Sequence, residues 1–155
     1  MLTNRAFRRR QRGASLVELA LVLFILLLIL AAIVDFGRVF NHYVVITNAS
    51  REGAREASRA AIVPELDLEA YKRAIEDAVR GEVKASSVDP EGLDIIIEPD
   101  PYPVSDPDAG TVAPPGGSIT VTVTYTVRTI IADIAGFGEL PLRARTAMRI
   151  YGLDE

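Results

Sequence analysis

The chain has 155 residues, with no cysteine, no tryptophan and a single histidine, His42. This length accommodates one ordinary domain. Without cysteine the chain has no disulfide scaffold, no thiolate zinc site and no cysteine nucleophile, and one histidine provides neither a multi-histidine metal site nor the usual parts of a catalytic triad. The composition therefore argues against an enzyme, and we expect no catalytic residue, no cofactor and no small-molecule substrate.

The charges are distributed unevenly along the chain. Residues 1–12 contain five arginines and no acidic residue, whereas residues 13–155 contain twelve basic and twenty-one acidic residues, a net charge of −9. The run from Leu19 to Val34 has no charge, and thirteen of its sixteen residues are Leu, Ile, Val or Phe. Thirteen such residues favour membrane insertion by about 4–8 kcal/mol in total. The run is therefore a membrane segment or a signal sequence.

A single membrane crossing fits this part of the chain. Residues 14–34 would form about 31 Å of helix, close to the hydrocarbon thickness of about 30 Å. Because arginines concentrate on the cytoplasmic side of membrane segments, we place residues 1–13 in the cytoplasm as a basic leader and the acidic remainder outside. The sequence therefore predicts a single-pass protein of the cytoplasmic membrane.

The start of the apolar run carries a processing signal. Downstream of the run, residues 32–34 make a poor signal-peptidase site because valine occupies the last position. Upstream, Gly13 ends the basic leader and Glu18 follows five residues later. This arrangement resembles a type IV prepilin (class III) signal peptide. The resemblance implies that a prepilin peptidase cuts between Gly13 and Ala14 and leaves the apolar helix on the mature protein.

Glu18 needs a physical explanation, because a carboxylate costs roughly 2.5–3.5 kcal/mol near the centre of a membrane helix and less near an interface. Two interpretations are open. In a filament, the new amine on Ala14 of a neighbouring subunit would neutralise Glu18, which makes Glu18 an assembly residue. Alternatively, Glu18 lies near the cytoplasmic interface and extends toward water.

The helical pattern continues beyond the membrane. No proline occurs between Ala14 and Pro64, so we predict one helix over residues 14–62, roughly 70 Å long. Small residues that permit close helix packing recur at every fourth position: Ala49, Gly53, Ala57 and Ala61. This face packs either on a neighbouring long helix or on the protein's own sheet. At the outer membrane boundary, we expect an ion pair between Asp35 and Arg38, with both side chains extending toward water.

Three segments, in this order, resemble the N-terminal region of TadE-like proteins: residues 12–23, residues 35–38 and residues 47–55. These proteins are small pilin-like components of the tight-adherence (type IV-related) pilus system of prokaryotes. The resemblance implies a minor pilin or pseudopilin, whose partners are other pilin-like subunits and pilus assembly proteins and which enters an extracellular pilus after assembly. Leu19 departs from the family, which commonly has an aromatic residue there. The alternative is a permanently anchored ectodomain that binds or senses another envelope component.

Residues 63–155 form the predicted ectodomain. We expect one helix from Asp67 to about Arg80, stopped by Gly81, and a loop over residues 99–117, which hold six of the nine prolines. Alternating apolar and polar residues predict strands with one buried and one wet face over residues 93–98, 118–128 and 140–151. The predicted fold class is α+β: a long N-terminal helix, transmembrane in its first half, with a small ectodomain of one helix and a roughly three-stranded antiparallel sheet.

Two further binding functions are weakly indicated. Asp106 and Asp108 offer oxygen ligands for calcium, but their loop lacks the glutamate of an EF-hand, so a solvated acidic turn is favoured and we expect no metal site. The basic leader precedes a membrane segment directly, so it indicates membrane topology and we expect no nucleic-acid partner.

Overall fold

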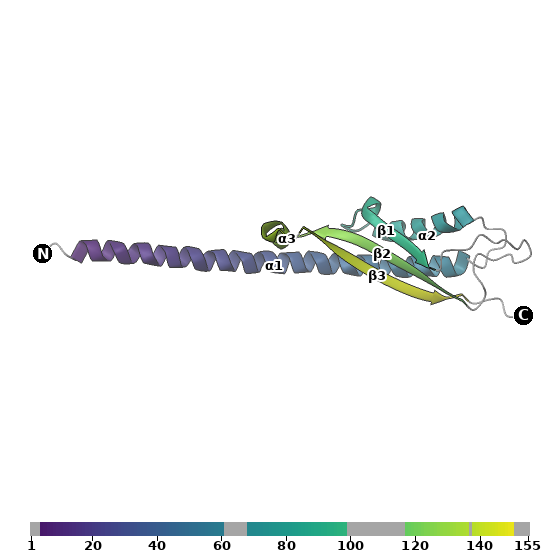
Figure 1. Cartoon of the computed structure of the whole chain (residues 1–155), viewed down its shortest axis with the longest axis horizontal. Coiled ribbons are helices and arrows are strands. Elements are labelled where there is room, and N and C mark those ends of the chain that lie inside the picture. Colours follow the sequence, from purple (N-terminus) through teal and green to yellow (C-terminus); the bar gives the residue numbers. More distant parts are fainter. Residues whose placement is uncertain (1–3, 61–67, 99–116, 137, 151–155) are drawn as a thin grey trace, which may run out of the picture.

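The computed structural model describes residues 4–60, 68–98, 117–136 and 138–150 (Figure 1). It has an α+β architecture with a long N-terminal helix and a three-stranded antiparallel sheet, which confirms the predicted fold class. The elements follow in the order α1 (Asn4–Ala60), α2 (Leu68–Val83), a 3-10 turn (Pro90–Gly92), β1 (Leu93–Glu98), β2 (Ser118–Arg128), α3 (Ile130–Ala135) and β3 (Glu139–Arg149).

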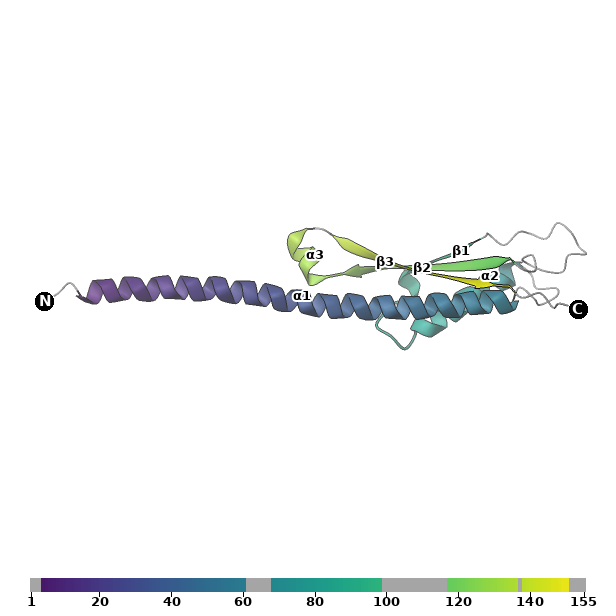
Figure 2. The ribbon, with the colours of Figure 1, turned by 90° about the horizontal axis from the view of Figure 1, so that it is seen from below.

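Helix α1 is a rod of 57 residues, about 85 Å long at 1.5 Å per residue. Its first half projects alone, and its second half carries the other elements, which we call the head (Figures 1 and 2). The helix begins at Asn4 rather than at Ala14, because the leader is rich in good helix formers and one glycine costs only about 1 kcal/mol. The predicted residues 61 and 62 lie outside the described residues.

The sheet has the order β1-β2-β3, with both neighbouring pairs antiparallel. Strands β1 and β2 have the bounds predicted from their alternation. Strand β3 begins one residue before the predicted start and ends at Arg149, so Ile150 lies just after it rather than in it. The predicted last residue, Tyr151, lies outside the described residues. One face of the sheet lies along the second half of α1 (Figure 2). The core therefore forms between this face, α1 and α2.

Gly53 lies where α1 meets both α2 and the sheet. A Cβ atom built on Gly53 would lie 2.5 Å from Val79 Cγ2 on α2 and 3.2 Å from Val121 Cγ1 on β2. Only a residue without a side chain allows these elements to approach so closely. Around this contact the fully buried apolar residues are Ile46, Ala49, Ala54, Ala57, Tyr71, Ile75, Val79, Val83, Val121 and Val123.

The prediction that the threonine face of β2 is wet is wrong for its first half. Thr122 is fully buried and Thr120 is 7% exposed. These residues pair with Arg145 and Glu98 respectively on the two outer strands, and Arg145 Nη2 donates to Glu98 Oε2 at 3.4 Å. The long side chains of this pair extend across the central strand and shield the two threonines from water.

The predicted stop of the second helix at Gly81 is also wrong. Helix α2 continues through Gly81 to Val83, which is fully buried one turn after Val79. Burial of a valine stabilises by about 1.5–3 kcal/mol, which exceeds the cost of about 1 kcal/mol for one glycine in a helix. The predicted cap, Asp67, lies outside the described residues.

Helix α3 was not expected from the sequence. Thr129 caps its N-terminus, since its Oγ1 accepts from the backbone N–H of Ala132 at 3.1 Å. Gly136 ends it with φ 74°, in the left-handed region that favours glycine. The capping signals are present in the sequence, but six residues are too few for a periodic pattern to appear.

Candidate assembly segment and juxtamembrane cleft

The first half of α1 presents its apolar side chains without cover from the rest of the chain. Every large apolar residue from Leu16 to Val34 is at least 42% exposed. Among the described residues, α1 is the helix that is long and apolar enough to cross a membrane. An apolar surface of this extent on a soluble protein would lead to association. This part of α1 is therefore suited to one membrane crossing.

The predicted processing and assembly residues, Gly13, Ala14 and Glu18, all lie on this exposed half of α1. Ala14 and Glu18 are four residues apart and so share one face of the helix. Glu18 forms no ion pair with any residue whose side chain the structure describes. A Cβ atom on Gly13 would have no neighbour within 4 Å, so packing does not require glycine there.

The small-residue face of α1 lies against the protein's own head. Ala49 and Ala57 are fully buried, and Gly53 contacts α2 and β2 as described above. Of the two partners expected for this face, a neighbouring helix or the protein's own sheet, the structure has the sheet together with α2. The fourth predicted residue, Ala61, lies outside the described residues.

Three hydrogen bonds join this face to the head. Ser50 Oγ lies 2.8 Å from Thr146 Oγ1 on β3, and Ser58 Oγ donates to the backbone carbonyl of Arg149 at 3.1 Å. Tyr71 on α2 donates its hydroxyl to the carbonyl of Ala57 at 3.0 Å, and burial raises the pKa of Tyr71 to about 12. These bonds satisfy polar groups between α1 and the head and fix their relative position.

Asp35 connects α1 to α3 at the end of the apolar run. Its Oδ2 accepts from the backbone N–H of Ile131, in the first turn of α3, at 2.7 Å. Its Oδ1 lies 3.9 Å from Arg38 Nη1, so the predicted ion pair forms, but the Asp35 side chain is only 8% exposed and does not extend into water as predicted. Sequence reasoning did not find the contact between Asp35 and α3, because the two residues that form it are 96 positions apart.

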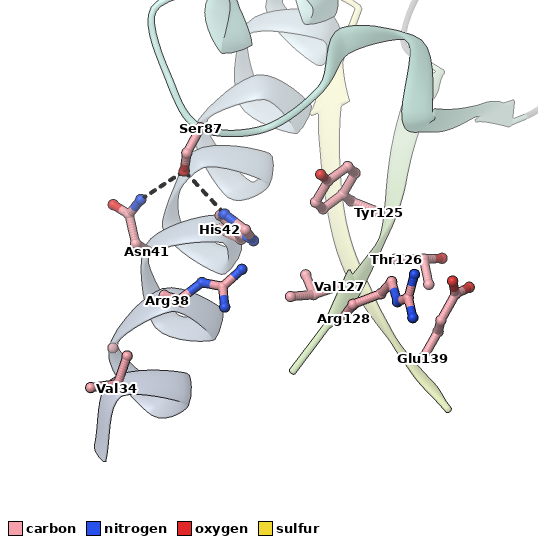
Figure 3. A pocket seen from close by; sticks show the side chains of 11 residues that line it. Val34, Arg38, Asn41, His42, Ser87, Tyr125, Thr126, Val127, Arg128 and Glu139 are labelled. Atoms are coloured by element: carbon pink, nitrogen blue, oxygen red, sulfur yellow. Dashed lines mark hydrogen bonds between the residues drawn. The ribbon is translucent and has the colours of Figure 1, made fainter. Parts of the chain in front are cut away.

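A cleft of about 700 Å³ opens beside this connection (Figure 3). Arg38, Asn41 and His42 of α1 line one side, and Tyr125 to Arg128 of β2 and Glu139 of β3 line the other. His42 Nε2 lies 3.0 Å from Ser87 Oγ, and its ring meets the Tyr125 ring edge-on at 5.6 Å between centroids. Sequence reasoning did not find this cleft, because its walls come from four separate segments of the chain: α1, β2, β3 and the connection that contains Ser87.

The surroundings of His42 favour its neutral form. Burial lowers the pKa of His42 below its usual 6.5, and the nearby Arg38 guanidinium lowers it further.

The cleft holds both signs of charge, since Arg38 and Arg128 lie with Glu139 on its walls. Among the described residues no group of three or more His, Asp or Glu side chains is placed to hold a metal ion. The proposed calcium ligands Asp106 and Asp108 lie outside the described residues.

Comparison with known proteins adds one match. A family model described as TadE-like protein matches residues 13–55, which include the exposed apolar segment of α1 and the first two residues of its small-residue face, Ala49 and Gly53. The resemblance inferred from the sequence is confirmed over this segment, and it indicates a protein associated with the Tad pilus. Neither a curated protein nor a solved structure matches the chain at a significant level.

Proposed function

Because its residues 13–55 are TadE-like, we propose that this chain is a minor pilin or pseudopilin subunit of a tight-adherence pilus. The observation that carries the proposal is the division of α1 into two functional halves. The first half is apolar and uncovered, whereas one face of the second half is buried against the head. A subunit of this form is held in the cytoplasmic membrane by α1 before assembly and contributes the same helix to a filament afterwards.

The charges support one orientation in the membrane. Five arginines precede the apolar run, and the part of the chain that follows it is acidic. By the positive-inside rule, the leader is cytoplasmic and the head lies outside the membrane. The head then occupies the compartment in which a pilus is built.

Neighbouring subunits would contact α1 through surfaces other than its small-residue face. The chain's own head covers the small-residue face, so this face is not available to a neighbouring subunit. Phe36 and Phe40 remain 72% and 58% exposed just beyond the apolar run, and their rings stack with centroids 6.3 Å apart. Neighbouring subunits therefore contact the uncovered half of α1 and this aromatic pair, which continues it outward.

Processing by a prepilin peptidase is the next step of the proposal. Cleavage between Gly13 and Ala14 removes the basic leader and creates an amine one helical turn from Glu18. Within an assembly, the Ala14 amine of one subunit pairs with Glu18 of its neighbour, which offsets the cost of a carboxylate in an apolar setting.

Replacement of Gly13 by valine tests the processing step. Gly37→Val is a matched control, because both glycines lie in α1 and neither has an atom within 4 Å of an added Cβ. In cells with an active prepilin peptidase, mass spectrometry should find mature wild type and Gly37→Val beginning at Ala14. Gly13→Val should retain the leader, since the peptidase recognises the residue before the cut.

An intact leader on the wild-type protein in such cells would contradict the proposal. It would favour the alternative, a permanently anchored ectodomain. The proposal assigns no chemical reaction and no cofactor to the chain, and its partners are the membrane, the peptidase and other pilus subunits.

A further inference from the structure

Helix α3 lies at the end of the head that is nearest the uncovered half of α1. Both views place the β2–β3 connection there (Figures 1 and 2). The hydrogen bond from the Ile131 backbone N–H to Asp35 holds α3 beside the first residue after the apolar run. If α1 crosses a bilayer, α3 is therefore held at the level of its outer surface.

The same tip presents apolar side chains that the described chain does not cover. Ile130 and Ile134, one turn apart on α3, are 41% and 68% exposed, and Leu140 at the adjoining start of β3 is 44% exposed. The helix is well defined despite this exposure, since Thr129 caps its start and Gly136 its end. Exposure of two isoleucines to water is unfavourable, so their transfer from water to an apolar environment would be favourable.

We propose that this tip, formed by α3 and Leu140, docks on the outer surface of the lipid bilayer. Ile130, Ile134 and Leu140 enter the interfacial region, and the Arg128–Asp133 pair, with nitrogen and oxygen 3.6 Å apart, stays at the level of the headgroups. The inference rests on the proposed membrane insertion of α1. It adds a second attachment point, which sets the tilt of the head relative to the membrane before the subunit is assembled.

Position and size favour lipid over a protein partner. The tip lies beside the end of the apolar run of α1, because Asp35, the first residue after the run, accepts a hydrogen bond from α3. Three side chains make a patch far smaller than the roughly 800 Å² that each partner buries in a stable protein–protein interface. A bilayer surface needs no such area from the tip, because α1 already holds the protein in the membrane.

The absence of cysteine allows a direct test by single labelled sites. Ile134→Cys and Ile130→Cys report on the tip. Ile96→Cys is a matched control, since Ile96 is also 41% exposed but lies on β1 opposite Thr122, six residues along β2 from Arg128. Leu30→Cys reports on the membrane segment. Each full-length variant carries an environment-sensitive fluorophore in vesicles of phosphatidylethanolamine and phosphatidylglycerol.

Two quenchers separate the outcomes. We expect lipids with a nitroxide near the headgroup to quench the label at the two tip sites, and iodide in water to quench only Ile96→Cys. Iodide quenching at the tip sites would overturn the inference, and so would protection from both quenchers, which would indicate a second protein. Lipid quenching of Leu30→Cys alone would leave membrane insertion intact and reject only the docked tip. If no site is quenched by lipid, both proposals fail.

Discussion

At the scale of single residues, Glu18 separates assembly from anchoring. If Glu18 pairs with the Ala14 amine of a neighbour, Glu18→Ala should leave membrane insertion unchanged or slightly better, because a desolvation cost of up to roughly 2.5–3.5 kcal/mol is removed. Assembly should nevertheless fall, because the amine loses its partner inside the filament. Recovery of the subunit in sheared pili, compared with its level in the membrane, measures both effects.

Glu18→Asp serves as the control for this prediction, since it keeps the carboxylate near the same place. We expect it to retain more assembly than Glu18→Ala. Normal assembly of the alanine variant would contradict the pairing, while cleavage after Gly13 would remain a separate question, because recognition of the leader precedes assembly.

His42 predicts a pH dependence that belongs to one side chain. Its pKa is lowered in the folded protein, so between the folded pKa and about 6.5 the unfolded chain binds more protons. The contribution of His42 to the free energy of unfolding should therefore be fully present above about pH 6.5. It should be lost progressively as the pH falls from 6.5 to the folded pKa, and the loss should level off below that pKa. Thermal unfolding of the full chain in detergent between about pH 7 and 5, above the range of ordinary carboxylates, measures this loss.

The chain has no other histidine, so His42→Gln should remove most of the dependence in this range. Glutamine keeps a polar side chain near Ser87, which His42 contacts at 3.0 Å. An unchanged slope in the glutamine variant would show that another group is responsible.

At the scale of elements, two glycines predict opposite effects of the same substitution. Gly53→Ala places a methyl group 2.5 Å from Val79 Cγ2 and should lower the free energy of unfolding by about 1–3 kcal/mol. Gly81→Ala adds a methyl group to an exposed helix position with no neighbour within 4 Å and should raise it by up to about 1 kcal/mol. Proteolysis of the head as a function of temperature, with the full chain in nanodiscs, compares the two variants with wild type.

The pair also tests the packing of α1. If Gly53→Ala proved as stable as Gly81→Ala, the close approach of α2 and β2 to α1 would be wrong. The covered face of α1 would then again be available to a neighbouring helix.

At the scale of the whole molecule, the charge asymmetry predicts the topology. A reporter enzyme that works only outside the cytoplasm, fused after Glu155, should be active, because five arginines hold the other end of the apolar run in the cytoplasm. Reversal of all five arginines to glutamate should reduce this activity, while a fusion protein without the substitutions provides the control. Activity of a cytoplasm-specific reporter at the same position would overturn the orientation.

Local patterns made much of the architecture predictable. The apolar run, the alternation in β1 and β2 and the uninterrupted helical sequence of α1 each lie within one segment of the chain, so neighbouring residues are enough to identify them. The TadE-like segment also lies in one stretch, residues 13–55, and its glycine and glutamate are recognised by their spacing. The short α3 was missed because its residues are too few for periodicity.

The sequence by itself determined the apolar run that could span a membrane, the asymmetry of charge, the fold class and the family resemblance, because each depends on composition or on spacing along the chain. Only the tertiary structure decided that α2 and the sheet cover the small-residue face of α1, that Thr122 is buried beneath a cross-strand ion pair, and that Asp35 accepts a hydrogen bond from α3. These features join residues dozens of positions apart. Their partners are set by how the elements pack, and packing leaves no periodic signal in the sequence around either residue.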